Sequence, residues 1–76
     1  FNLMIMGKNY KNWNVEDKVK IIFSHSDDKG KVGIIKEVRP SFCKIEMKGY
    51  PKLRNHTYGQ FIKITDEEFE ELNSKQ

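Results

Sequence analysis

The sequence predicts a mostly β fold, a small five-stranded barrel followed by a short C-terminal helix. Apolar and polar side chains alternate with a period of two along several short segments, which is typical of half-buried strands. Turn-forming residues separate these segments at intervals of about 8–12 residues, the spacing found in small all-β sandwiches and barrels. A helix-capping sequence follows the last segment, so the strands are expected to lead into a helix.

Five segments carry the strand pattern, and they are residues 19–23, 31–38, 42–47, 53–58 and 61–64. The first is expected to turn Val19, Ile21 and Phe23 towards the core. The third turns Cys43 towards the core, where it is interpreted as a small buried hydrophobe. Glycine, proline and short polar residues mark the intervening turns, at residues 24–30, 39–41 and 48–52 and at Gly59.

Thr65 is the predicted N-cap of a helix over residues 66–73. Its hydroxyl can accept a hydrogen bond from the amide of Glu68, and the Glu68 side chain can reach back to the amide of Thr65. One domain is therefore predicted over residues 15–73, after an irregular lead-in over residues 1–14.

The composition is that of a small globular protein. The chain has 76 residues, of which 37% are hydrophobic and 33% charged, and a domain of this size buries only roughly 60% of its unfolded surface. The single cysteine, Cys43, excludes an internal disulfide and fits a reducing, cytoplasmic setting. No apolar run approaches the ~18 residues that span a membrane. The start at Phe1 is consistent with residues 1–3 being added or processed, with Met4 or Met6 as the native start.

Charge is distributed unevenly along the chain. Residues 1–64 hold thirteen Lys and Arg against six Asp and Glu, a balance of +7, whereas residues 65–76 hold one Lys against five acids, a balance of −4. A basic body attracts polyanions, of which nucleic acid is the common one. The alternative is that lysines keep the edges of the sheet soluble and unpaired.

One hairpin resembles a known motif. It contains Asp17-Lys18-Val19, then Asp28-Lys29-Gly30-Lys31-Val32-Gly33, and then Ile34-Ile35-Lys36-Glu37-Val38. This pattern resembles the KOW motif of ribosomal proteins and NusG-type transcription elongation factors, and the resemblance implies an SH3-like barrel that contacts RNA, DNA or polymerase. Gly30 supplies a turn geometry with positive φ, and Gly33 permits a bulge or a close approach. The spacing of three between Ile35 and Val38, both expected in the core, itself implies a bulge.

Eight residues are the candidates for nucleic-acid binding. By the resemblance, Lys29, Lys31 and Lys36 face a partner, and Arg39 lies near them along the hairpin. The others follow the fourth predicted strand, and they are Lys52, Arg54, His56 and Tyr58. Cations position a phosphate backbone, and aromatic rings stack on bases. The alternative for this strand is that Tyr58 fills the barrel while Arg54 pairs with an acid.

Catalytic and metal sites are not expected. His25 and His56 lack the spacing of a zinc site and are interpreted as surface residues. Trp13 and Tyr10 are expected to cap the open end of the barrel, because burial of large rings helps a marginal core. The acids gather on the predicted helix, where capping explains them better than acid–base chemistry. No cofactor is implied.

The sequence therefore predicts a non-enzymatic nucleic-acid-binding module, acting in transcription or translation as a monomer or weak dimer. The main alternative is a protein-interaction module, such as a phage-encoded regulator or inhibitor that docks on a host complex. Its contact face would be the acids of the helix, which are Asp66, Glu67, Glu70 and Glu71. A third, weaker alternative is a methyl-lysine reader, which would require three converging aromatic rings.

Overall fold

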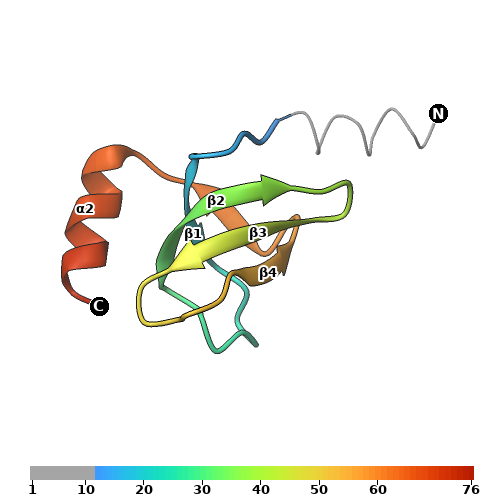
Figure 1. The fold of residues 1–76 in the computed structure, drawn as a ribbon. Helices are drawn as coiled ribbons and strands as arrows, with labels where there is room; N and C mark the ends of the chain where they lie inside the picture. The colour runs from blue at the N-terminus through green and yellow to red at the C-terminus, as the bar shows by residue number, and fades with distance from the viewer. Residues whose placement is uncertain (1–11) are drawn as a thin grey trace.

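Five antiparallel strands form one sheet, and a helix follows them in the chain (Figure 1). They belong to a computed structural model that describes residues 12–76. In chain order the elements are β1 (Lys18–Ile21), β2 (Val32–Val38), β3 (Phe42–Met47), β4 (Arg54–Thr57), β5 (Phe61–Lys63) and α2 (Asp66–Ser74). The prediction of a mostly β fold with a C-terminal helix is confirmed. Tyr10 and most of the predicted lead-in lie outside the described residues.

The first predicted strand is too long, and the assignment of Phe23 to the core is wrong. Strand β1 ends at Ile21, whose carbonyl accepts a hydrogen bond from the amide of Gly30 at 2.8 Å. Beyond that bond the chain enters the loop of residues 22–31, and Phe23 is exposed there with its ring 5.5 Å from that of His25. Gly30 has φ of +84°, as expected for the tip of this turn.

The sheet is strongly curled. Its strand order is β4-β3-β2-β1-β5, so β4 and β5 are the two edges, although only residues 58–60 separate them in the chain. Five strands laid flat would place the edges about 19 Å apart, whereas the four peptide steps from Thr57 to Phe61 span at most roughly 14 Å. The two edges are therefore drawn towards each other. Within residues 12–76 they share no ladder, so the sheet is not closed.

A bulge in β2 produces part of this curl. The pairing of β2 with β3 shifts between Ile35 and Glu37, which leaves Lys36 as the extra residue. Because of this shift, Ile35 and Val38 both turn inwards: Ile35 is fully buried and Val38 packs against the core. The bulge that the spacing of these two residues predicted is confirmed.

The core lies on the concave face of the sheet. Its buried members are Val19, Ile21, Ile35, Cys43, Ile45, Met47 and Phe61. Trp13 packs against this cluster, with its ring 4.8 Å from that of Phe61 in an edge-to-face arrangement. The prediction that Cys43 is buried is confirmed, and Trp13 packs against the core cluster.

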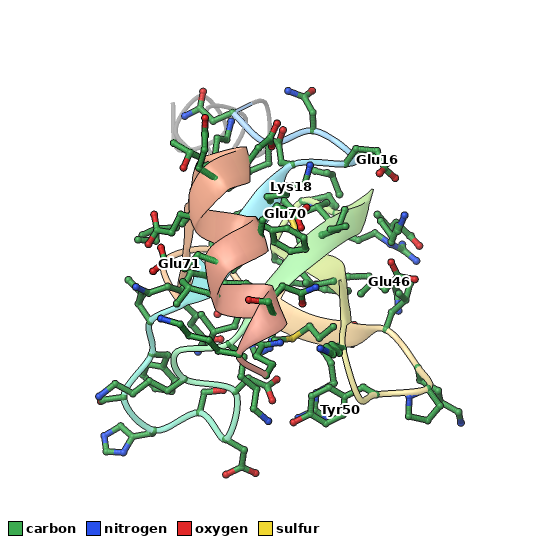
Figure 2. All side chains as sticks on the ribbon, turned by 90° about the vertical axis from the view of Figure 1, so that its left-hand side faces the viewer. Glu16, Lys18, Glu46, Tyr50, Glu70 and Glu71 are labelled. Atoms are coloured by element: carbon green, nitrogen blue, oxygen red, sulfur yellow. The ribbon has the colours of Figure 1, made fainter. Side chains whose placement is uncertain are left out.

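Helix α2 covers the opposite face of the sheet, over β1 and β2 (Figures 1 and 2). Its N-cap is Thr65, whose hydroxyl accepts a hydrogen bond from the amide of Glu68 at 3.1 Å. The Glu68 carboxylate lies 3.7 Å from the ammonium of Lys20, so it ties the helix to β1. Phe69 is the buried residue of the helix. No helix in the described part of the chain is long and apolar enough to cross a membrane.

Substitution of Gly33 by alanine is expected to lower the free energy of unfolding by about 2 kcal/mol. A β-carbon at this position would lie 2.5 Å from Cγ2 of Ile45 and 2.7 Å from the carbonyl oxygen of Glu46, and the latter belongs to the backbone of β3. Urea unfolding measures the change. The control is Asn55→Ala, an exposed position on β4, where the change should stay within about 0.5 kcal/mol. Equal stability of the two variants would contradict the tight contact between β2 and β3.

Candidate nucleic-acid interface

Two loops meet at one end of the sheet. One comprises residues 22–31, between β1 and β2, and the other comprises residues 48–53, between β3 and β4. Figure 1 shows both at the lower edge of the molecule, and Figure 2 labels Tyr50 in the second loop. We call this region, together with the adjoining Arg54, the loop end.

Asp28 holds the two loops together. It is fully buried, and its carboxylate accepts a hydrogen bond from the hydroxyl of Tyr50 at 2.6 Å. The same carboxylate accepts a bond from Nε of Arg54 at 3.1 Å and lies 2.9 Å from Nε2 of His56. Three side chains from β4 and its preceding loop thus converge on one acid of the other loop. The positions of both loops are therefore coupled.

Burial by itself would raise the pKa of Asp28, but the hydrogen bonds from Tyr50, Arg54 and His56 outweigh it and lower the pKa below its ordinary value. The carboxylate is therefore ionised at neutral pH. In turn, the hydrogen bond to Asp28 raises the pKa of Arg54. Asp28 and Arg54 therefore form a fixed ion pair, and the negative charge of Asp28 lies inside the protein, away from the surface.

Tyr50 is at the centre of a cationic group. The guanidinium carbon of Arg54 lies 4.2 Å from the centre of the Tyr50 ring. On the same ring, the ammonium of Lys31 lies 5.1 Å from the centre and donates a hydrogen bond to the hydroxyl at 3.2 Å. Two cations, one from the loop before β2 and one from β4, are thereby held beside one half-buried ring.

Most of the unpaired lysines of the described chain lie at the loop end. Within residues 12–76, the lysines that form no ion pair with an acid are Lys29, Lys31, Lys44, Lys48 and Lys52. All of these except Lys44, which is on β3, belong to the two loops, and Lys48 donates a hydrogen bond to the carbonyl of Asn73 on α2 at 3.1 Å. The loop end therefore carries four of these lysines against two acids, of which Asp28 is buried and bonded to Arg54 and Asp27 is exposed, so positive charge remains in excess on its surface.

Lysines and arginines elsewhere in residues 12–76, apart from Lys44, are matched with acids. Lys36 lies 2.9 Å from the Glu16 carboxylate and 3.8 Å from that of Glu46, and the hydrogen bond to Glu16 raises the pKa of Lys36. Arg39 pairs with Glu37. These two predicted site residues lie towards the other end of β2, so the structure does not bring them together with Lys29, Lys31, Lys52 and Arg54.

His56 and Tyr58 also lie away from the loop-end surface. The expectation that His56 is a surface residue is wrong: it is only 7% exposed, because the curl of the sheet turns it inwards onto Asp28. Tyr58 packs against the core and donates a hydrogen bond to the carbonyl of Arg39 at 2.6 Å. The alternative reading of this strand, in which Tyr58 packs inside and Arg54 pairs with an acid, is the one observed.

Sequence reasoning missed two residues of the loop end, Tyr50 and Lys48. Tyr50 follows a glycine and precedes a proline, so residues 48–52 were expected to be only a turn. The available signal was composition, since two lysines flank an aromatic residue in this turn, a combination typical of nucleic-acid contacts. The buried role of Asp28 had no comparable signal, because polar loops commonly contain aspartate.

A hollow lies away from the loop end, beside β5 and the chain before β1. It has a volume of ≈ 510 Å³ and is lined in part by Trp13, Tyr58 and Ile62. The ammonium of Lys63 sits 5.3 Å from the centre of the Trp13 ring and 3.2 Å from the Asp17 carboxylate. The charge at this hollow is therefore already paired within the chain.

Few of the described groups offer chemistry of another kind. Burial raises the pKa of the Cys43 thiol, which keeps it protonated at neutral pH and unsuited to nucleophilic attack. Within residues 12–76, no three His, Cys, Asp or Glu side chains are grouped as a metal ion would require.

No protein-family model matches the sequence, and no curated protein matches it significantly.

Acid is expected to weaken the fold through Asp28. Its pKa in the folded state is lowered, so its ionised form contributes stability above the unfolded pKa of about 3.9, and this contribution is lost as the pH falls through the folded pKa. Urea unfolding of the wild type and Asp28→Asn between about pH 6 and pH 3 measures the effect. The difference in free energy of unfolding between the two proteins should shrink below about pH 4. A difference independent of pH would contradict the assignment.

Proposed function

We propose that this protein is a small, non-enzymatic nucleic-acid-binding module, an SH3-like barrel of the KOW type that binds DNA or RNA mainly through phosphate contacts at the loop end. The single observation that carries the proposal is the concentration of lysines without an acidic partner in the two loops, where one of the two acids, Asp28, is buried and already bonded. Phosphate contacts by Lys and Arg supply most of the affinity of such modules.

The barrel assignment is supported by the curl of the sheet and by the hairpin that resembles a KOW motif. The short connection between β4 and β5 draws the edges together. Gly30 has the positive φ that the hairpin loop requires, and Gly33 lies in the close approach between β2 and β3. These are the features by which small barrels turn their strands.

Binding of the wild-type protein to nucleic acid tests the proposal. Fluorescence anisotropy with labelled duplex DNA, single-stranded DNA and structured RNA is recorded across a salt series from ~50 to ~200 mM. We expect micromolar or tighter binding at the low-salt end, with the logarithm of the affinity falling linearly with the logarithm of salt concentration. Absence of binding to all three polymers at low salt would refute the proposal.

A protein-interaction module is the second candidate, and the surface of α2 favours it. Glu67 and Glu70 are exposed and form no ion pair within residues 12–76, although the helix as a whole is tied to β1. A pull-down that recovers one stoichiometric protein after nuclease treatment would support this candidate. If the variant with Glu67→Gln and Glu70→Gln no longer recovers that protein, the contact lies on the helix.

A further inference from the structure

Beside Tyr50 lies a shallow hollow that phosphate binding alone does not explain. It has a volume of ≈ 370 Å³ and is lined by Tyr50, Pro51, Lys52, Leu53 and Arg54. This volume falls at the small end of the range of roughly 300–1,000 Å³ typical of ligand sites. The lining combines an apolar part with two cations on a single segment of chain.

The apolar part of the hollow faces solvent. Leu53 is 42% exposed, and Pro51 is exposed as well. Neither could contact a phosphate favourably, because burial of a charged group against apolar surface costs free energy. A ligand that uses the whole hollow must therefore present an apolar surface next to an anion.

The cations beside the hollow are placed to hold that anion. Lys52 is exposed and forms no ion pair within the described residues. Arg54 is 40% exposed, and within residues 12–76 only its Nε makes a hydrogen bond, to Asp28, which leaves its terminal NH₂ groups for a ligand. Since Asp28 fixes both Arg54 and Tyr50, these side chains need little further ordering when a ligand binds.

Single-stranded nucleic acid has this combination of surfaces, and duplex does not. In a duplex the faces of the bases are stacked inside the helix. A shallow protein surface therefore contacts mainly sugars and phosphates. In a single strand a base can leave the stack and bury its face on a protein, while the adjoining phosphate is held by a cation.

We propose that the loop end selects single-stranded nucleic acid, with an unstacked base in the hollow at Pro51 and Leu53 and the adjoining phosphate between Lys52 and Arg54. This inference rests on the proposed function and specifies its substrate. This preference for the single strand is the opposite of the one expected from charge alone. A duplex has the higher charge density, so a purely electrostatic site binds the duplex more tightly.

The test compares one oligonucleotide sequence in three forms by anisotropy at fixed salt: as a single strand, as a duplex with its complement, and as a single strand of the same length without bases. The wild-type protein should bind the single strand about fivefold or more tightly than either of the other forms, because only this form can bury a base on the apolar surface of the hollow. The strand without bases requires no change in the protein, so this comparison does not depend on the folding of any variant.

The matched variants are Leu53→Ser and Ile62→Ser. Leu53 and Ile62 are aliphatic and similarly exposed, at 42% and 43%, but Ile62 lines the hollow beside β5. Leu53→Ser should lose about fivefold of the single-strand affinity, because it removes apolar surface that the base buries, and leave the duplex affinity unchanged. Ile62→Ser should change neither.

Two results would overturn the inference alone. In the first, the wild type binds all three forms with a steep salt dependence and no preference for the single strand with bases. In the second, Leu53→Ser and Ile62→Ser have equal effects. If instead none of the forms binds at low salt, the proposed function fails together with the inference.

Discussion

Substitution of Asp28 by alanine is expected to lower the free energy of unfolding by about 3 kcal/mol, the largest effect on stability of any change proposed for this chain. The carboxylate is fully buried and bonds to Tyr50, Arg54 and His56. Its removal leaves buried donors without a partner, which costs more than the net value of the bonds themselves. We expect the lower end of the usual range for a broken buried pair, because Arg54 is 40% exposed and can be rehydrated.

Urea or thermal unfolding of Asp28→Ala measures this loss. A domain of this size has a total stability of only about 4–11 kcal/mol, so the variant should unfold at a much lower urea concentration. The matched control is Asp27→Ala, which removes the neighbouring exposed acid of the same loop and should change stability by less than about 0.5 kcal/mol. Equal losses in the two variants would show that the effect arises from charge and not from the bonds made by Asp28.

Neutralisation of three loop-end lysines is expected to have the largest effect on binding. The variant carries Lys29→Ala, Lys48→Ala and Lys52→Ala. Each lysine that contacts a phosphate should contribute roughly 0.9 to the slope of log affinity against log salt on duplex DNA. Loss of all three should lower the affinity at 0.1 M salt by about tenfold or more, with a flatter salt dependence.

The control is a second triple variant with the same change in net charge. It carries Lys20→Ala, Lys36→Ala and Lys75→Ala, which remove lysines that are already paired with Glu68, Glu16 and Glu71 respectively. This variant should keep most of the affinity, because its lysines are partly neutralised and lie outside the loop end. If both triple variants lose affinity equally, net charge and not the loop end governs binding.

The strands and the helix could be predicted closely from local patterns. Alternation along residues 42–47 gave the limits of β3, and Thr65 gave the start of α2, since both signals depend on neighbours in the sequence. The bulge at Lys36 was also predictable, because two core residues three apart cannot both face inwards on a regular strand. The exposure of Phe23 was not predictable, because β1 ends at a hydrogen bond from the amide of Gly30 to the carbonyl of Ile21, and this bond joins the two ends of the loop.

The candidate site was only partly predictable. Lysines could be identified from the sequence, but which of them are paired depends on contacts between distant segments, such as Lys36 with Glu16 and Lys18 with Asp66. The inward position of His56 depends on the curl of the sheet and on Asp28, which precedes it by 28 residues. Periodicity along a strand places a residue on a face, but it does not show whether that face meets solvent or another loop.

The most direct test of the loop end as the nucleic-acid-binding surface is a titration of the ¹⁵N-labelled protein with a short oligonucleotide, followed by two-dimensional NMR. The amide signals that shift should be those of residues 28–31, 48–50 and 52–54, and the signals of α2 and of the hollow at Trp13 should stay in place. Shifts concentrated on α2 or around Trp13, with the two loops unaffected, would contradict the account.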